Sequence, residues 1–509
     1  MRSDNVLRNT LFLTLSGILA KTFDFIFRVY YSRTLGSEGM GIFSLCLGAF
    51  GIVLNLVTGG VGIAVSKTVS EHYAKGRYCE AFKTVNAAIS AVGTIGLLVL
   101  IIICCFSEEI AKFLIKEQRV KLALILISPS VIFMGISYGV KGYFYASRRV
   151  IVPASSEFLE QAVKITVIRF LLKKLLPYGT EYGCAAVCLG LSIGEFCSCA
   201  YLYTFYRRDK LRLASYKIPA FDKAVLLRIL KISMPIMLSS ILCSFLRMYE
   251  DVLIVDVLKK SGSDKALALS IYGEIHGMVM PFIVFPLTLL SSCFTLLVPE
   301  ISRAYHLKNE VRLKTLISRL YRFSLMFGFF VYCIFFVMGR DLAGLLYNNR
   351  EIAPYINALS LIAPFMFIDS VSAGILNGMG KQIYLFIYSI LDSLGRILLI
   401  YLLMPRYGIN SFIVIIIISN AFTSVLTFKK VIKLSKIGIK NSGRLWRHIL
   451  AVSVTCMASK FFKINGASAS STVFGVAFLG MIYFVTALLT GSANIGDFKW
   501  IRSRLFSGT

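Results

Sequence analysis

The chain has 509 residues, of which 57% are hydrophobic and only 16% are charged, and its formal net charge is +29. Its apolar runs repeatedly exceed the roughly 18 residues that cross a bilayer, which excludes an ordinary soluble protein and predicts an all-α polytopic membrane protein. The basic residues concentrate in alternate loops. We therefore interpret them as topology signals close to anionic lipid headgroups, and we expect no nucleic-acid partner.

Fourteen transmembrane helices are predicted along the chain, with connections too short to hold a soluble domain. Their centres lie near residues 20, 53, 93, 133, 162, 195, 245, 284, 329, 365, 392, 420, 453 and 480. Placing the amino-terminus inside puts the more basic loops on the cytoplasmic side. Both termini of this multi-pass protein of the cell membrane are thus expected to be cytoplasmic.

The first predicted helix carries Lys21, Asp24 and Arg28 at spacings of three and four residues, which places all three on one helical face. Each mid-helix charge costs roughly 2.5–3.5 kcal/mol on insertion, whereas each Leu, Ile, Phe or Val returns only about 0.3–0.6 kcal/mol. The helix inserts comfortably only if this face meets water or polar partners. This pattern predicts a polar passage.

Glycine and proline are expected to bend or unwind several of the predicted helices, although both residues are also simply commoner in membrane helices than in soluble ones. The glycines are Gly59, Gly60 and Gly62 in helix 2, and the prolines are Pro129, Pro235, Pro281, Pro286 and Pro364 in helices 4, 7, 8 and 10.

The second half of the chain repeats the charge pattern of the first. Glu160 and Lys164 form an acid–base pair at i,i+4 in the fifth helix, and Asp392 and Arg396 form another in the eleventh. Because six helices separate the copies, both halves start on the same side of the membrane. This arrangement predicts parallel repeats that face each other across a cavity.

The repeat also predicts how the chain divides into domains. Gly142 and Gly374 are separated by the same interval as the two acid–base pairs. We expect a six-helix lobe at residues 1–215, a second six-helix lobe at 216–435, and helices 13 and 14 with a cytoplasmic tail at 436–509.

Two groups of charged residues within the predicted helices form the candidate site. The first, on helices 1 and 7, is expected to line a substrate cavity and consists of Lys21, Asp24, Arg28, Arg247, Glu250 and Asp251. The second, on helices 5 and 11, is expected to couple an ion or to pair helices and consists of Glu157, Glu160, Lys164, Asp392 and Arg396. Mutual neutralisation remains open for both groups. If Asp24 and Arg28 neutralise each other, however, Lys21 is left as a cationic excess, which suits an anionic headgroup such as a diphosphate.

The sequence contains no catalytic motif, no nucleotide-binding loop and no metal-ligand spacing. We therefore expect a transporter that is not an enzyme and that has no cofactor and no metal. Energy, if used, is expected to come from the membrane potential or from a proton or sodium gradient that acts on acids within the helices.

Three loop motifs, in their order among the predicted helices, carry a family resemblance: residues 35–43 (LGSEGMGIF), 299–302 (PEIS) and 378–381 (GMGK). The chain resembles the polysaccharide-exporter branch of the multidrug/oligosaccharidyl-lipid/polysaccharide (MOP) flippase superfamily, and more narrowly the stage V sporulation protein B group. The resemblance implies a MATE-like fold with two lobes that alternate between inward-open and outward-open forms. It also implies a groove for a polyprenyl tail at helices 13 and 14.

The resemblance implies roles for particular residues as well. Relatives that flip lipid II use basic residues of the cavity, and Lys21 and Arg28 occupy the matching helix 1. The chain departs from them in helix 2, expected at about residues 42–65, which contains no base. It departs also in helix 8, which offers Glu274 and His276 in place of arginines.

We expect a flippase that translocates a polyprenyl-diphosphate-linked sugar precursor of peptidoglycan, spore cortex or another cell-wall polysaccharide, with Lys21, Arg28 and Arg247 contacting phosphate. Two alternatives stay open. A cation-coupled multidrug exporter of the same fold would favour an acidic cavity. A membrane scaffold would recruit cell-wall synthesis enzymes through its inner loops.

Overall fold

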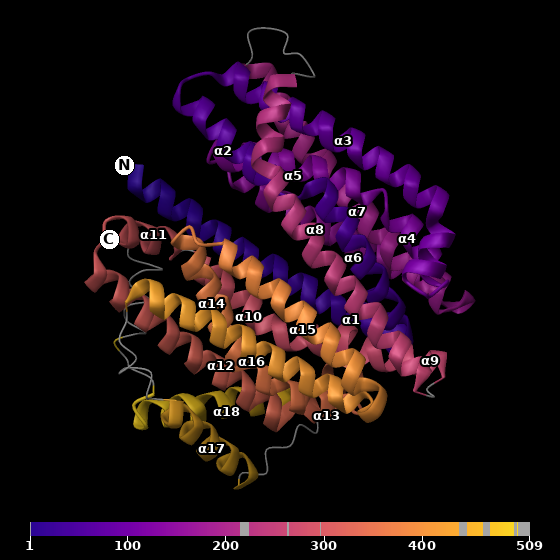
Figure 1. The fold of residues 1–509 in the computed structure, drawn as a ribbon, viewed down its shortest axis with the longest axis vertical. Helices are drawn as coiled ribbons and strands as arrows, with labels where there is room; N and C mark the ends of the chain where they lie inside the picture. Colours follow the sequence, from indigo (N-terminus) through magenta and orange to yellow (C-terminus); the bar gives the residue numbers. More distant parts are fainter. Residues whose placement is uncertain are drawn as a thin grey trace. The chain divides into compact units, whose positions relative to one another are not determined.

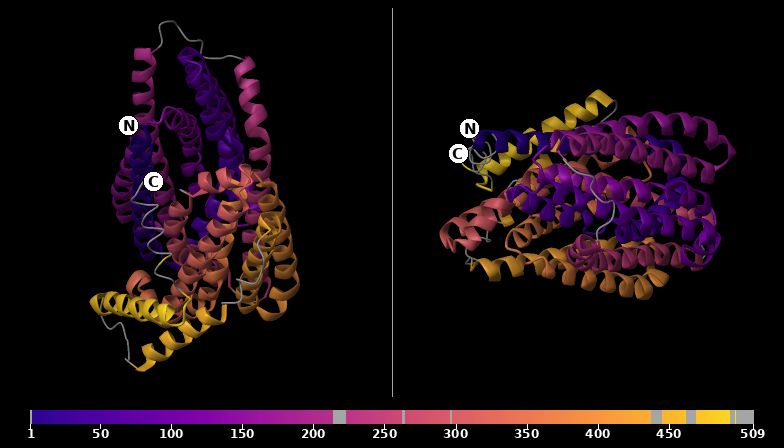
Figure 2. Two further views of the ribbon diagram at one scale, coloured as in Figure 1. Left: turned by 90° about the vertical axis from the view of Figure 1, so that its left-hand side faces the viewer. Right: turned by 90° about the horizontal axis from the view of Figure 1, so that it is seen from above.

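The computed structural model describes residues 2–213, 223–261, 264–295, 297–436, 445–461, 469–492 and 496. Within these ranges every regular element is a helix and none is a strand (Figures 1 and 2). The predicted all-α class is confirmed.

Eleven helical segments in the described part of the chain are long and apolar enough to cross a membrane, by length and composition. One of them, Leu15–Ala74, has 60 residues. It includes most of the helix Arg2–Thr58 and all of the helix Val61–Ala74, with breaks at Gly36 and Gly60. It is far longer than the roughly 20 residues of one crossing. The predicted total of fourteen transmembrane helices stays a prediction.

The chain divides into two compact units. The amino-terminal unit comprises Leu15–Lys259 and Ser263–Gly273, and the carboxyl-terminal unit comprises Met1–Thr14, Lys260–Gly262 and Glu274–Thr509. Compactness alone does not identify the copies of a repeat or the parts that move. The predicted division at residues 1–215, 216–435 and 436–509 therefore stays a prediction.

Long helices separated by short breaks make up the amino-terminal unit (Figure 1). They are α1 (Arg2–Thr58), which belongs to this unit from Leu15 onward, α2 (Val61–Ala74), α3 (Tyr78–Glu109), α4 (Val120–Ile127), α5 (Ser130–Ala146), α6 (Ile151–Leu175), α7 (Thr180–Leu213), α8 (Lys223–Lys260) and α9 (Lys265–Tyr272). Inside α1 the backbone breaks at Gly36, whose φ of 72° and ψ of −179° lie in a region that is essentially restricted to glycine. α1 therefore consists of two helical segments, one before and one after Gly36.

Some of the predicted helix breaks are present and others are not. α2 begins directly after Gly60, which has a φ of 74°. Pro129 immediately precedes α5, and Pro364 is the second residue of α14 (Ala363–Gly378). Pro281 is likewise the second residue of α10 (Met280–Thr295), whereas Pro235 in α8 and Pro286 in α10 lie within helices that continue through them.

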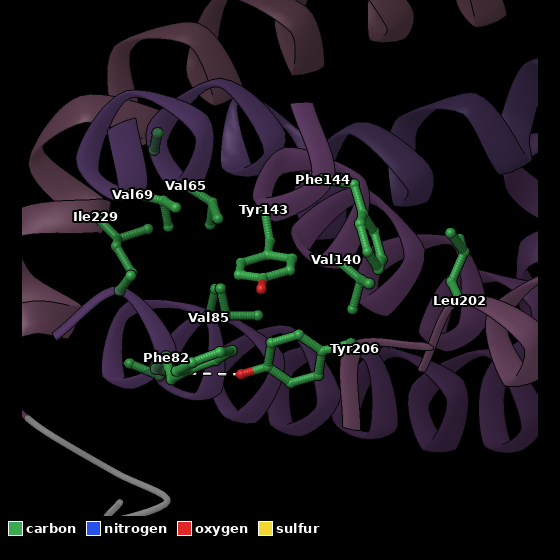
Figure 3. Close-up of a cluster of buried hydrophobic side chains, with 14 of the residues drawn as sticks. Val65, Val69, Phe82, Val85, Val140, Tyr143, Phe144, Leu202, Tyr206 and Ile229 are labelled. Atoms are coloured by element: carbon green, nitrogen blue, oxygen red, sulfur yellow. Dashed lines mark hydrogen bonds between the residues drawn. The ribbon is translucent and has the colours of Figure 1, made fainter. Parts of the chain in front are cut away.

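One hydrophobic core of the amino-terminal unit gathers side chains of α2, α3, α5, α6, α7 and α8 (Figure 3). Tyr143 and Tyr206 lie fully buried within it. The Tyr206 hydroxyl donates to Oδ1 of Asn86 at 2.9 Å, and the Tyr143 hydroxyl donates to Oδ2 of Asp209 at 3.3 Å. Because each buried hydroxyl has a partner, the core keeps its aromatic packing without an unsatisfied polar group at these positions.

The carboxyl-terminal unit is built from a second series of helices. Besides α10 and α14 they are α11 (Val298–His306), α12 (Glu310–Tyr347), α13 (Ala353–Leu359), α15 (Ile383–Tyr407), α16 (Ile409–Ser435), α17 (Leu445–Phe461) and α18 (Ala469–Leu489). The side chain of Asn309 caps α12 by accepting a hydrogen bond from the Arg312 amide at 3.0 Å. α18 is tied to α12 through the Tyr483 hydroxyl, which donates to the carbonyl of Met326 at 2.9 Å.

Gly142 and Gly374, which occupy matching positions in the predicted repeat, have different surroundings. A Cβ atom at Gly142 would lie 2.8 Å from the carbonyl oxygen of Gly62 and 3.2 Å from Cβ of Val65, so α5 and α2 cross in close contact there. A Cβ atom at Gly374 would have no such neighbour within 4 Å. The shared interval in the sequence therefore does not imply a shared packing role.

Candidate functional site

α1 carries the charged face that its sequence predicts. Lys21 and Asp24 are exposed and line a cavity, whereas Arg28 is half-buried and is not among the lining residues. The Nε atom of Arg28 is buried and has no hydrogen-bond partner among the described residues. Two of the three predicted residues therefore share one cavity, and the third lies apart from it.

The cavity at Lys21 and Asp24, termed the acidic cavity, has a volume of about 270 Å³ and is bounded by α1, α5, α6 and α7. Its lining residues are Ala20, Lys21, Asp24, Met134, Ser137, Tyr138, Lys141, Glu157, Glu160, Gln161 and Glu195. Four of these residues are acidic and two are lysines. The structure thus joins members of both predicted groups in one cavity with an excess of acidic side chains.

Ion pairs hold several of these carboxylates. The Lys164 ammonium group bonds to Glu160 one turn away on α6, and its Nζ lies 3.9 Å from Oε1 of Glu195 on α7. On α5, Nζ of Lys141 donates to Oε1 of Glu157 at 3.1 Å. The side chains of Glu160 and Lys164 are each only 10% exposed. Removing one partner of such a buried pair leaves an uncompensated charge.

A second cavity of about 650 Å³, termed the basic cavity, is bounded by the end of α1, by α2, α5 and the first part of α6. Its lining residues are Thr58, Gly60, Gly62, Ile63, Ser66, Lys67, Ser70, Tyr138, Lys141, Gly142, Tyr145 and Glu157. It shares Tyr138, Lys141 and Glu157 with the acidic cavity. Because its lining has two lysines and one carboxylate, positive charge prevails here.

Lys67, Lys141 and Glu195 line the cavities but are not among the residues of the predicted site. The sequence predicts that helix 2 ends near residue 65, which assigns Lys67 to a loop, whereas α2 continues to Ala74. Lys141 and Glu195 carried a usable signal, since each is a charge within a predicted helix. Their places in the cavities depend on which helices pack together, which the sequence pattern does not state.

The predicted residues of α8 do not line either cavity. Arg247 is exposed, Glu250 is buried and Asp251 is half-buried. A Cβ atom at Gly48 would lie 3.0 Å from Oδ2 of Asp251, so Asp251 packs closely against the second segment of α1. The proposed partnership of α8 with Lys21 at one substrate site stays a prediction.

In the carboxyl-terminal unit the second acid–base pair forms as the i,i+4 spacing predicts. Nε of Arg396 lies 3.3 Å from Oδ2 of Asp392, and the Ser419 hydroxyl of α16 donates to Oδ1 of Asp392 at 2.5 Å. A second contact between helices joins Thr427 to Oδ1 of Asp369 at 2.9 Å. Among the described residues no group of three or more His, Cys, Asp or Glu side chains is placed to hold a metal ion.

A separate charge cluster surrounds Glu117, which is fully buried and lies between two of the candidate spans, Tyr78–Leu114 and Val120–Ala146. Nε of Arg119 donates to its Oε1 at 2.9 Å, Nζ of Lys265 lies 3.3 Å from the same oxygen, and Nζ of Lys259 lies 3.7 Å from Oε2. Burial raises the pKa of Glu117, but the Arg119 hydrogen bond and the surrounding positive charges outweigh burial. The net effect is a pKa below the ordinary value of a glutamate.

Comparison with known proteins identifies the family. A family model described as "Polysaccharide biosynthesis protein" matches residues 6–305, and one described as MatE matches residues 235–402. Because the first match covers more than half of the 509 residues, the chain belongs to the polysaccharide biosynthesis protein family. This membership places it in the polysaccharide branch of the MOP superfamily.

Individual relatives match over most of their length. Stage V sporulation protein B of Bacillus subtilis (strain 168) is 24% identical over 498 residues, which is 96% of each protein. A structure of the lipid II flippase MurJ in an inward closed conformation superposes with a TM-score of 0.71 at 16% identity, covering 96% of this chain and 100% of the other. An inward-facing MATE multidrug resistance transporter gives a TM-score of 0.66 at 13% identity, covering 84% and 99%.

These likenesses establish the fold as the one shared by MurJ and MATE proteins. With the long apolar helices, they identify a multi-pass membrane protein and bear out the predicted resemblance to the stage V sporulation protein B group.

Proposed function

We propose that the protein is a flippase that carries a polyprenyl-diphosphate-linked sugar precursor across the cytoplasmic membrane by alternating access. The end-to-end match to stage V sporulation protein B and the fold shared with a lipid II flippase support this assignment. A precursor of peptidoglycan, spore cortex or another cell-wall polysaccharide has the required chemistry, a long apolar tail with a charged and sugar-bearing headgroup.

One structural observation carries the proposal. Two adjoining cavities within a unit of apolar helices are lined by Lys21, Lys67 and Lys141. Basic groups at the depth of membrane helices are costly and are retained for a polar cargo or for paired charges. A diphosphate that leaves water needs several cationic or hydrogen-bonding partners, and lysine ammonium groups supply them.

The proposal includes fourteen transmembrane helices with both termini in the cytoplasm. The candidate segment Leu15–Ala74 is long enough for two crossings and is broken at Gly36. α6 has 25 residues and α17 has 17, lengths that also suit a crossing, although neither is among the eleven apolar segments. Counting Leu15–Ala74 as two crossings and adding α6 and α17 raises the eleven segments to the predicted fourteen.

Coupling to the membrane potential, to protons or to sodium ions is part of the same proposal. The acidic cavity holds Asp24, Glu157, Glu160 and Glu195, which are acids that a coupling cation or proton can neutralise. Asp392 in the carboxyl-terminal unit is bound to Arg396 and Ser419, so we assign it a helix-pairing role first.

Native mass spectrometry of the purified protein tests the function. Wild type, Lys21→Ala/Arg28→Ala and the exposed-lysine control Lys173→Ala are each exposed to lipid II, undecaprenyl phosphate and a hydrophobic cation. We expect wild type and the control to bind lipid II in preference to the other two ligands, and the double variant to lose that preference. An absence of preference in wild type contradicts the flippase assignment.

A cation-coupled multidrug exporter is the second candidate, because the MatE match and the acidic cavity favour it. Selective binding of the hydrophobic cation, abolished by Asp24→Asn, would support it. A membrane scaffold for cell-wall synthesis enzymes instead predicts that every cavity variant complements a deletion strain at wild-type abundance.

A further inference from the structure

The basic cavity owes its shape to a close crossing of α2 and α5, which lie side by side (Figure 1). Gly62 and Gly142 stand at the crossing, where a side chain on either would press against the backbone of the other helix. Side chains next to the crossing on both helices line the cavity. Ser66, Lys67 and Ser70 come from α2, and Lys141 comes from α5.

The two lysines of this cavity differ in their ion pairing. Lys141 is bound to Glu157, the one carboxylate of the lining. Lys67 is exposed to the cavity and makes no ion pair or side-chain hydrogen bond in the described part of the chain. Four hydroxyl-bearing residues complete the polar part of the lining: Ser66, Ser70, Tyr138 and Tyr145. The lining is therefore one of donors with a net positive charge.

The first turn of α2 adds to this positive character. Gly60, Gly62 and Ile63 line the cavity, and the helix begins at Val61. The amides of the first helical turn have no acceptor within their own helix, and the helix dipole places partial positive charge at that end. Lys67, Lys141 and the start of α2 thus converge on a cavity whose volume falls in the range of roughly 300–1,000 Å³ typical of ligand pockets.

We propose that the basic cavity binds the diphosphate of the lipid-linked substrate, with Lys67 as its permanent counterion and Lys141 as a counterion that the diphosphate takes over from Glu157. This inference rests on the proposed function and deepens it. It places the charged headgroup inside the amino-terminal unit and assigns it to residues of α2 and α5 outside the predicted substrate group. Glu157 then competes with the substrate for Lys141.

The exchange has a defined consequence for the neighbouring cavity. Once Lys141 turns to the diphosphate, Glu157 is left facing Asp24, Glu160 and Glu195, with Lys21 as the remaining base of the acidic cavity lining. The side chain of Glu157 is 37% exposed, so water solvates the released carboxylate in part. Replacing Glu157 by the isosteric, neutral Gln removes the competitor and is expected to strengthen anion binding.

Binding of farnesyl diphosphate to the full-length protein in neutral-lipid nanodiscs tests the site, with farnesol as the reference for partition of the tail into lipid. Comparison with farnesyl monophosphate shows how much of the binding affinity depends on the second phosphate. Binding is measured by calorimetric titration at about 0.15 M salt, because low salt strengthens the attraction of surface charges for the anion. The variants are Lys67→Gln, Glu157→Gln and, as matched control, Lys75→Gln, since Lys75 is exposed, directly follows the last residue of α2 and lies outside both cavities.

We expect Lys67→Gln to bind farnesyl diphosphate about tenfold more weakly than wild type, the effect of losing one charge-assisted contact. Lys75→Gln is expected to match wild type, and Glu157→Gln to bind several-fold more tightly. A gain of affinity cannot come from misfolding, so it guards against a trivial loss in Lys67→Gln. Equal affinity of the Lys67 and Lys75 variants, or unchanged or weaker binding by Glu157→Gln, would overturn the proposal.

The outcomes separate this inference from the function on which it rests. Lys67-dependent binding of farnesyl diphosphate without any selective binding of lipid II would uphold the anion site and reject the flippase assignment. Selective binding of lipid II that depends on Lys21 and Arg28 but not on Lys67 would uphold the flippase and reject the site.

Discussion

Replacing Gly142 by alanine is expected to destabilise the amino-terminal unit, because α5 has no room for a side chain at its crossing with α2. The added Cβ would lie 2.8 Å from the carbonyl oxygen of Gly62 and 3.2 Å from two atoms of Val65. The nearest atom belongs to the backbone and cannot rotate away. Either the two helices separate or the bonded geometry distorts.

The magnitude follows from two opposing terms. Inserting a methyl group into a tightly packed contact costs typically 1–3 kcal/mol, whereas alanine is favoured over glycine in a helix by about 1 kcal/mol. Gly139, one turn earlier on α5, is also buried, but a Cβ there would meet only Cβ of Ala88, at 3.9 Å. Gly139→Ala therefore keeps the gain in propensity without the clash. The two variants should differ in free energy of unfolding by about 1–3 kcal/mol.

Thermal unfolding of the purified variants in one detergent, followed by circular dichroism, measures this difference. We expect Gly139→Ala to unfold at or above the temperature of wild type, and Gly142→Ala to unfold several degrees lower. Gly374→Ala is a second control, because a Cβ there has no such neighbour within 4 Å. If Gly142→Ala proves as stable as Gly139→Ala, the close crossing of α2 and α5 is refuted.

Three further variants are expected to lower stability for different reasons. Glu160→Gln leaves Lys164 with the more distant Glu195 as its remaining carboxylate. We expect the free energy of unfolding to fall by about 3 kcal/mol, the low end of the cost of breaking a buried ion pair. Thermal or denaturant unfolding measures this loss. Gly36→Ala forces alanine to a φ of 72° and a ψ of −179°, at an expected cost of about 1–3 kcal/mol in the same assay. Glu117 has a lowered pKa in the folded protein, so its stabilisation is fully present above its unfolded pKa of about 4.3 and is lost as pH falls through the folded value. We expect Glu117→Gln to be less stable than wild type at pH 7 and to approach it in acid, as followed by unfolding at a series of pH values.

Each of these expectations has its own control. Lys164→Met combined with Glu160→Gln removes both charges of the pair and should recover part of the stability lost in Glu160→Gln; a further loss contradicts the account of a stranded charge. Gly76→Ala is the comparison for backbone strain, because its φ is also positive, at 70°, but lies in an exposed turn. For Glu117, a stability difference from wild type that is constant from pH 7 into acid would show that its charge does not contribute.

The sequence by itself determined the class of the protein and the charged face of its first helix. Apolar runs of bilayer length can be satisfied only by helices in a membrane, and the spacing of Lys21, Asp24 and Arg28 fixes a common helical face whatever the neighbours are. The i,i+4 spacing likewise determined that Glu160 meets Lys164 and that Asp392 meets Arg396, because both partners lie on one helix.

Tertiary packing decided which of these charges share a cavity. Lys21 and Glu157 line one cavity because α1 and α6 border the same space, and Lys67 and Lys141 line another where two glycines let α2 and α5 cross closely. Helical periodicity states the direction of a side chain relative to its own axis, but the neighbour across that face depends on the contacts of the whole unit. The role of Gly142 shows the same limit, because its counterpart in the repeat, Gly374, occupies an open position.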